Sequence, residues 1–215
     1  MFAGIIKNLG VIISTIKQPF GLSVCVRPLI INETSLLDHL SVDDSVAVNG
    51  VCLTATKIDH QNHFFWADIV HTTLEKSNLS QLKPDQKVHL ELSIKASDRL
   101  GGHLVQGHVQ SVGTVKDIVD KGGNFDVTIQ IPSAEMKYLV NEGPIVIDGV
   151  SLTVAKVIEN ESSIIITIIP HTWNQTRFSE FTIGEKVNIE TDLFAQYIHQ
   201  YLDNLSLSKK IGTIL

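Results

Sequence analysis

Residues 104–115 read LVQGHVQSVGTV, and they repeat the opening of the chain, residues 1–12, which read MFAGIIKNLGVI. Gly107 aligns with Gly4, and Gly113 aligns with Gly10. Two further blocks repeat at a constant shift of 99 residues (144 − 45 and 178 − 79). SVAVNGVCLTATKI from residue 45 matches PIVIDGVSLTVAKV from residue 144, and LSQLKPDQKVHLE from residue 79 matches FSEFTIGEKVNIE from residue 178. A fixed internal period of this kind predicts a duplicated structural unit.

Length and composition agree with two packed domains. The 215 residues suffice for one large domain or two smaller ones, and the repeat decides for two. Hydrophobic residues make up 43% of the chain, which favours packed cores over disorder. The formal charge of −6, without a run rich in lysine or arginine, argues against nucleic acid as a partner.

The sequence also predicts the compartment. The opening MFAGIIKNLG is a poor signal peptide, and no run of about 18 apolar residues would span a membrane. Of the two cysteines, Cys52 has Ser151 at its repeat position, so a disulfide is not needed to hold the unit, and Cys25 also lies in the first copy. We therefore expect a cytoplasmic protein with reduced thiols.

Both copies contain short runs rich in Val, Ile and Thr, separated by Gly, Asn, Asp and Pro, as is typical of strands. Asn49-Gly50 and Asp148-Gly149 are strong hairpin signals. Short helical turns are expected at 35–40 and 134–140. About six short strands per copy predict a mainly β fold of two small closed barrels. The expected strands are 5–17, 23–26, 45–48, 52–58, 63–67 and 87–92, then 107–119, 124–131, 145–147, 151–158, 163–169 and 186–190.

After Asp192 the pattern changes to apolar residues at helical spacing, from Leu193 to Leu205, with no copy in the first half. Such a helix must bury its apolar stripe. It either folds back on its own barrel or forms a subunit interface, and its narrow seam favours the interface. We expect a first barrel at 1–97, a second barrel at 98–191, and a trimerisation helix with a tail at 192–215.

The two copies differ in acid–base type at a few places. His108 replaces Ile5, Ser151 replaces Cys52, and Asp192 replaces Ser93. One interpretation is that a single ancestral pocket became two pockets with different tasks; sequence drift is the alternative. His103 and His108 would lie on opposite faces of one strand, which makes them a poor metal pair. A hydrogen-bonded structural histidine is the alternative reading for each.

Small polar residues recur in the same slots of both copies. Thr54 and Thr153 follow Cys52 and Ser151 on one strand face, and Thr73 aligns with Thr172. These groups form either two similar pockets for two similar ligands or a polar outer face of each barrel. No metal, phosphate-loop, dinucleotide or serine–histidine–aspartate motif is present.

Six blocks, MFAGII, SVAVNGVCLT, LGGHLVQGHV, IDGVSLTV, IPHT and VNIETD, together resemble the riboflavin synthase family, the single-chain type distinct from lumazine synthase. The resemblance covers nearly the whole chain. It implies two tandem six-stranded Greek-key β-barrels, a C-terminal α-helix and a homotrimer in which the first barrel of one subunit faces the second barrel of a neighbour. Lumazine synthase is a further candidate partner.

The resemblance also implies a reaction. Two molecules of 6,7-dimethyl-8-ribityllumazine react, and one transfers a four-carbon unit to the other, giving riboflavin and 5-amino-6-ribitylaminouracil without metal or organic cofactor. The protein would hold the two rings at close distance and move protons at the acidic 7-methyl group. His108 is the candidate for proton transfer, and Asp192 with Ser151 and Thr153 would position a nucleophile at the other ring.

The site residues implied by the resemblance fall into three groups. Positions matching catalysis or close ligand contact are Phe2, Ser45, Cys52, His108, Ser151, Thr153 and Asp192. The first-barrel pocket would carry Cys52, Leu53, Thr54, Asp68, Ile69, Val70, His71, Thr72, Thr73, Gly107, His108 and Val109. The second would carry Ser151, Leu152, Thr153, Ile169, Pro170, His171, Thr172, Trp173 and Asn174, with Gly4, Ile5 and Ile6 contributed by a neighbouring subunit.

Three positions depart from the family pattern. Ala3 stands where the family often has Thr, Thr72 where it often has Glu, and Glu142 where a Lys is common near the first-barrel ligand. The main rival interpretation is a lumazine- or flavin-binding protein of the same superfamily that does not turn its ligand over. A flavin reductase barrel would need a nicotinamide site, for which the sequence gives no sign.

Overall fold

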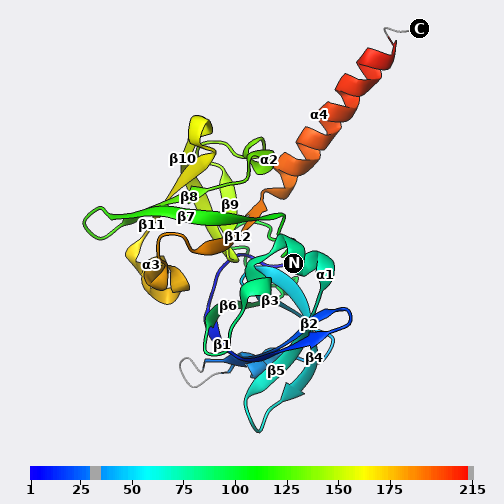
Figure 1. Cartoon of the computed structure of the whole chain (residues 1–215), viewed down its shortest axis with the longest axis vertical. Coiled ribbons are helices and arrows are strands. Elements are labelled where there is room, and N and C mark those ends of the chain that lie inside the picture. Colours follow the sequence, from blue (N-terminus) through cyan, green and yellow to red (C-terminus); the bar gives the residue numbers. More distant parts are fainter. Residues whose placement is uncertain (30–34, 213–215) are drawn as a thin grey trace.

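A computed structural model describes residues 1–29 and 35–212 (Figure 1). The chain forms two closed six-stranded antiparallel barrels, and the long helix α4 (Leu193–Gly212) projects away from both. Residues 213–215, the end of the predicted tail, lie outside the described residues. The predicted fold class, two barrels followed by one helix, is therefore confirmed.

The N-terminal barrel has the strand order β1-β2-β5-β4-β3-β6. Strands β3, β4 and β5 pair in succession and β6 returns beside β3, which is the Greek-key arrangement. Among the described residues of this barrel, the short helical segments that connect the strands are η1 (Leu36–His39), α1 (His71–Lys76) and η2 (Asn78–Gln81). The strands are β1 (Asn8–Gln18), β2 (Gly21–Pro28), β3 (Ser45–Val48), β4 (Val51–Asp59), β5 (Phe64–Val70) and β6 (Lys87–Leu92).

The C-terminal barrel repeats this topology, with the hydrogen-bonded order β10-β11-β8-β7-β12-β9. Its strands are β7 (Ser111–Asp120), β8 (Phe125–Gln130), β9 (Pro144–Ile147), β10 (Val150–Ile158), β11 (Ser163–Ile168) and β12 (Lys186–Thr191). Its short helical segments are α2 (Ser133–Met136), η3 (Glu159–Glu161), α3 (Pro170–Gln175) and η4 (Arg177–Glu180). The helices α1 and α3 were not predicted, because His-Thr-Thr and Pro-His-Thr carry no apolar periodicity.

The predicted strands 5–17 and 107–119 both begin too early. Strand β1 begins at Asn8 and β7 at Ser111, and residues 101–110 form only one isolated bridge, between Val105 and Phe2. Gly4 and Gly107 have φ of 71° and 79°, outside the range of a strand, so the extended ladder cannot pass through them. The expectation that His103 and His108 occupy opposite faces of one strand is therefore wrong.

Each barrel has its own apolar core. In β5, Phe65, Ala67 and Ile69 are buried while Asp68 and Val70 face outward, as the two-residue strand period requires. The register shifts between Ala55 and Lys57 in β4 and at the equivalent place in β10. Such bulges bend a strand, which helps a small sheet to close.

The barrels meet at their β3–β4 and β9–β10 turns. A Cβ atom built on Gly50 would lie 2.5 Å from the backbone nitrogen of Gly149, so only glycine permits this approach. Phe2 and Val105, equivalent residues of the two copies, exchange two backbone hydrogen bonds of 2.7 and 3.1 Å. The junction is therefore close to two-fold symmetric.

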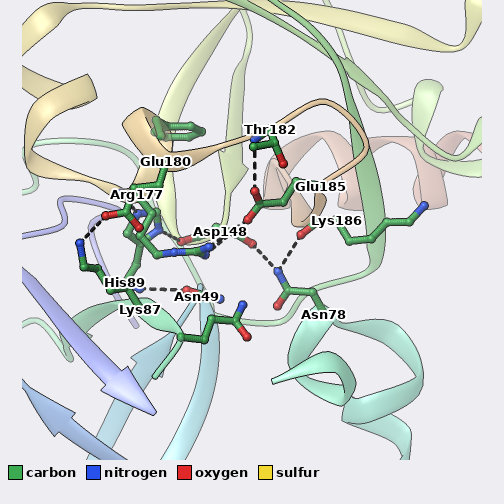
Figure 2. A network of polar contacts seen from close by, with 12 residues as sticks. Asn49, Asn78, Lys87, His89, Asp148, Arg177, Glu180, Thr182, Glu185 and Lys186 are labelled. Carbon is green, nitrogen blue, oxygen red and sulfur yellow. Dashed lines mark hydrogen bonds and ion pairs between the residues drawn. The ribbon is translucent and has the colours of Figure 1, made fainter. Parts of the chain in front are cut away.

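A buried polar network holds the junction together (Figure 2). Its two halves use different residues for the same bonds. His89 accepts the Arg177 N–H at Nε2 (2.7 Å) and donates from Nδ1 to the Asp148 carbonyl (2.8 Å). Its counterpart Asn188 accepts the Asn78 N–H (2.6 Å) and donates to the Asn49 carbonyl (2.8 Å). An imidazole and an amide thus occupy equivalent places.

Asp148 and Arg177 carry charge in this network, whereas their counterparts in the first copy, Asn49 and Asn78, are amides. In Figure 2 the Asp148 side chain lies between Arg177, whose Nη1 is 3.8 Å from Asp148 Oδ2, and Asn78, whose Nδ2 donates to Asp148 Oδ1 at 3.0 Å. Complete burial raises the pKa of Asp148 to about 7, although the Asn188 N–H and Arg177 oppose the rise. At the rim, half-exposed Lys87 and Glu180 join the two barrels by an ion pair.

His89 predicts a pH dependence of stability. Burial lowers its pKa from 6.5 to about 3, because the buried imidazolium would lose its hydration, and the nearby Arg177 charge lowers it further. Protonation would also place a second donor at Nε2, which faces the Arg177 N–H. The stability that neutral His89 contributes is present above pH 6.5 and is lost as the pH falls toward 3. Between pH 6.5 and 5 we expect a loss of about 2 kcal/mol in the free energy of unfolding.

His89→Asn, which copies Asn188, should abolish that part of the slope. Chemical denaturation of both proteins from pH 5 to 8 measures it. The contribution of Asp148, present at acidic pH and lost as the pH rises toward 7, is common to both proteins and cancels in the comparison. Identical slopes for the two proteins would contradict the prediction.

Helix α4 leaves the C-terminal barrel with its apolar side chains exposed. Asp192 caps its first turn by accepting the Ala195 N–H at 3.0 Å. Phe194, Tyr197, Ile198, Tyr201 and Leu202 are each more than half exposed, so the helix does not fold back on its own barrel. The sequence left open whether this helix packs on its own barrel or forms a subunit interface, and its exposed apolar side chains agree with a subunit interface. Among the described residues, no helix is long and apolar enough to cross a membrane.

Candidate active site

Cys52 and Ser151 lie at equivalent places in the two barrels, two residues beyond the turns at the junction. The N–H of Cys52 donates to the Gly107 carbonyl at 2.9 Å, and the N–H of Ser151 donates to the Gly4 carbonyl at 2.8 Å. Residues 1–7 therefore reach the barrel wall that carries Ser151, and residues 101–110 reach the barrel wall that carries Cys52. We call these the N wall, built on β4 and residues 107–109, and the C wall, built on β10 and residues 4–6.

Two buried glutamates fix these segments. Glu91 accepts the N–H groups of Ala3 (2.9 Å) and Gly4 (3.1 Å), and Glu190 accepts those of Gln106 (2.7 Å) and Gly107 (3.0 Å). Burial raises the pKa of both carboxyl groups, although the backbone N–H groups lower it. Sequence reasoning missed both residues; the signal was the Glu that ends the repeated block at 91 and 190.

Gly4, Ile5 and Ile6 belong to the C wall of their own chain. The expectation that a neighbouring subunit contributes them is wrong, because Gly4 binds Ser151 within one chain and Ile6 packs against the core of the C-terminal barrel. Val109 packs in the same way against the core of the N-terminal barrel. The N-terminal segment crosses from the N-terminal barrel to the C-terminal barrel at the junction, so the contact between Gly4 and Ser151 needs no second chain.

Several side chains of the N wall and of the neighbouring β5 and α1 are open to solvent. Thr54, Asp68, Val70, His71 and Thr72 are exposed, whereas Leu53 and Ile69 point into the core. Ser45 pairs with Thr54 across β3 and β4, which brings it to the same region. Asp68 accepts a 2.6 Å hydrogen bond from Ser23, and His71 Nε2 lies 3.2 Å from the Pro19 carbonyl oxygen.

The C wall contains a cluster that the N wall lacks. Ser151 Oγ lies 2.7 Å from His103 Nδ1. Burial lowers the pKa of His103 below 6.5, and the Asp192 carboxylate partly opposes this shift. His103, which the sequence placed on the strand face opposite His108, thus contacts a candidate catalytic residue.

The remaining C-wall candidates divide into open and packed residues. Thr153, Ile169, Pro170, His171 and Asn174 are exposed, and Leu152 and Thr172 are partly buried. The Trp173 ring stacks on Phe125 with ring centroids 3.8 Å apart, and it packs against the barrel core. The Trp173 side chain is therefore packed against other side chains of its own barrel.

Two further candidates lie away from the walls. Phe2 is fully buried among Ala47, Val105 and Val146, with Cys52 packed against it, so it supports the N wall from behind. Glu142 belongs to the C-terminal barrel, where its N–H donates to the Val154 carbonyl at 2.8 Å. Glu142 therefore lies on the other barrel from the N wall.

His108 is exposed and lines a cavity of about 480 Å³ where both barrels and α4 approach one another. Lys76 of α1, Gln110, Glu135 of α2 and Gln196 of α4 also line it. His108 and His103 thus lie at different barrels, one beside each wall. Among the described residues, no group of three or more His, Cys, Asp or Glu side chains is placed to hold a metal ion.

Comparison with known proteins agrees with this architecture. The family model described as the lumazine binding domain matches twice, at residues 3–93 and 106–192. The chain is 36% identical to the riboflavin synthase of Bacillus subtilis (strain 168), over 100% of this chain and 95% of that protein. It is 37% identical to the riboflavin synthase of Actinobacillus pleuropneumoniae, over 94% of this chain and 90% of that protein.

Solved structures give the same fold. LumP complexed with riboflavin superposes with a TM-score of 0.79 at 24% identity, over 89% of this chain and 100% of that chain. LumP complexed with 6,7-dimethyl-8-(1'-D-ribityl) lumazine gives a TM-score of 0.77 at 23% identity, over 89% and 99%. At this level of identity, the likeness shows the double-barrel fold and nothing further.

Proposed function

The chain belongs to the riboflavin synthase family, with two lumazine binding domains, and we propose that it converts two molecules of 6,7-dimethyl-8-ribityllumazine into riboflavin and 5-amino-6-ribitylaminouracil. It is then a transferase, in which one substrate molecule gives a four-carbon unit to the other. The relatives at 36% and 37% identity span nearly the whole chain, which supports assigning their activity to it.

The single observation that carries this proposal is the pair of walls with one backbone frame and two sets of side chains. In both walls a glycine carbonyl accepts the N–H of Cys52 or Ser151, and a buried glutamate fixes the glycine segment. This shared backbone arrangement suits the binding of one molecule of the same ligand on each wall. The N wall adds a thiol and the C wall adds Ser151 with His103, so two identical ligands meet different chemistry.

Assembly of several copies would complete the site. The equivalent residues Val70 and Ile169 are 50% and 54% exposed, one beside each wall, so both walls present apolar surface to solvent. We propose a homotrimer in which the N wall of one subunit meets the C wall of the next. Two ligands held in this way react as if within one molecule, an advantage of about 10⁵-fold or more.

The proposed roles follow from the placement. His108, exposed beside the N wall, transfers protons there. Ser151, Thr153 and Asp192 orient the reacting groups at the C wall, where Ser151 contacts His103 and Asp192 influences its pKa. Cys52, Ser45 and Thr54 contact the ligand on the N wall.

The test is to mix the purified protein with 6,7-dimethyl-8-ribityllumazine. We expect flavin absorbance to appear, with one riboflavin formed for every two substrate molecules consumed. Quenching of ligand fluorescence without flavin formation would indicate a binding protein and contradict the proposal.

His108→Gln should lower turnover by about tenfold to a hundredfold or more, because the amide cannot take up or release a proton near neutral pH. Ligand binding, measured by fluorescence quenching, should persist. His60→Gln, an exposed histidine in the turn between β4 and β5, is the matched control and should leave turnover unchanged. Normal turnover of His108→Gln would remove the proposed role.

A further inference from the structure

His103 is held against the C wall by close backbone packing. A Cβ built on its neighbour Gly102 would lie 2.2 Å from the Ala3 carbonyl oxygen and 2.7 Å from Ser151 Oγ. Only glycine fits there, so the segment lies directly on Ser151. This approach brings His103 Nδ1 to 2.7 Å from Ser151 Oγ, a good hydrogen-bond distance.

The bond can run in either direction, because its donor depends on the tautomer of the His103 ring. Burial favours the neutral imidazole, whose two ring nitrogens are one donor and one acceptor. With Nδ1 accepting the Ser151 hydroxyl proton, the ring proton lies on Nε2. His103 Nε2 is buried and has no hydrogen-bond partner among the described residues. In that tautomer, Nδ1 faces Ser151 with a lone pair that can take up a proton.

We propose that His103 is the positioning residue of Ser151 and draws a proton from the ligand on the C wall through the Ser151 hydroxyl. This inference rests on the proposed function and adds a residue and a proton path to it. The acidic 7-methyl group of the lumazine is the proton source. Its C–H bond breaks, a new O–H bond forms at Ser151 Oγ, and the original Ser151 proton moves to His103 Nδ1. The electron pair stays on the ligand as a stabilised anion.

The surroundings of His103 suit this transfer. The charged group that influences it is the Asp192 carboxylate at the start of α4, which favours the imidazolium formed by the transfer. Its hydrogen-bond partner is the polar Ser151 on β10, and its neighbour Gly102 lies against the backbone of Ala3. At the N wall, the thiol of Cys52 receives no hydrogen bond from a histidine among the described residues, so the relay distinguishes the two walls.

The variant pair His103→Asn and His103→Ala separates a proton relay from a structural hydrogen bond. The Asn Oδ1 takes the place of Nδ1 and still accepts the Ser151 hydroxyl, but it cannot take up a proton. We expect His103→Asn to keep its melting temperature and ligand binding while kcat falls by about 100-fold or more. His103→Ala should lose the same activity and, in addition, some stability.

The pH profile is the second measurement. Wild-type kcat should fall at acidic pH, below the ordinary imidazole range, because His103 must be neutral to accept the proton. His103→Asn should lack this acidic limb. Ser151→Ala should match His103→Asn, and the double variant should be no slower than either, since groups that act as one unit are not additive.

The two proposals can fail separately. A wild-type protein that forms no riboflavin overturns the proposed function. Near-normal kcat in His103→Asn, or an unchanged acidic limb, overturns the relay. Deuterium exchange into the 7-methyl group of the bound lumazine in D₂O measures proton removal by the relay independently of four-carbon transfer. The wild type should speed this exchange, and His103→Asn should slow it by removing the contribution of the C wall; equal rates for both proteins overturn the relay.

Discussion

A chain that ends at Asp192 should sediment as a monomer and lose turnover almost completely, by about 10⁵-fold or more. Helix α4 carries Phe194, Ile198 and Tyr201 on one face, all more than half exposed, and its removal leaves the barrels without this surface. Without the neighbouring subunit, the ligand on the N wall no longer meets one on a C wall. The loss then equals the advantage of holding two reactants together.

Point variants test the same surface in the full-length chain. Ile198→Asp with Tyr201→Asp places charges in the apolar seam and should also give monomers. Gln200→Asp, exposed on another face of α4, is the matched control and should keep the assembly. Analytical ultracentrifugation and steady-state turnover are measured on all three. An intact oligomer after removal of residues 193–215 would contradict the role of α4, and full turnover by a monomer would contradict a site shared between subunits.

The barrels could be predicted because local and repeated signals agree. Asn49-Gly50 and Asp148-Gly149 specify the two central turns, and the constant shift between copies shows that both units share one topology. The left-handed φ of Asn49, 46°, and of Asp148, 45°, is the backbone that these dipeptides favour. The boundary predicted between residues 97 and 98 lies in the connection between the barrels and stays a prediction.

The segment 101–110 could not be predicted because its strand-like pattern is overridden by distant contacts. Glu190, more than eighty positions along the chain, binds the N–H groups of Gln106 and Gly107. In this turn His103 lies beside Ser151 and His108 lies beside the N wall. In a straight strand, only one of the two side chains would have faced the pocket. No periodicity in the sequence encodes a bond from a buried carboxylate to a loop.

Gly107→Ala and Gly4→Ala should each destabilise the protein by about 2 to 5 kcal/mol and strongly reduce turnover. Both glycines have positive φ, which disfavours a side chain by about 1–2 kcal/mol. The added Cβ of Gly107→Ala would also lie 2.6 Å from Cys52 Cβ, and that of Gly4→Ala 2.6 Å from Ser151 Cβ. Relieving such overlap costs about 1–3 kcal/mol more.

Gly122→Ala separates these two contributions. Gly122 has φ of 84°, yet nothing lies within 4 Å of a Cβ built there, so this variant carries the backbone strain alone. We expect it to lose about 1 kcal/mol and to keep full turnover. Chemical denaturation and turnover of the three variants are compared under one condition. If Gly107→Ala and Gly4→Ala resemble Gly122→Ala, then the glycine segments do not pack on Cys52 and Ser151, and the two walls are not built as described. If they lose much more, the excess measures how closely each segment is held on its wall, and the loss of turnover shows that the two ligands depend on that contact.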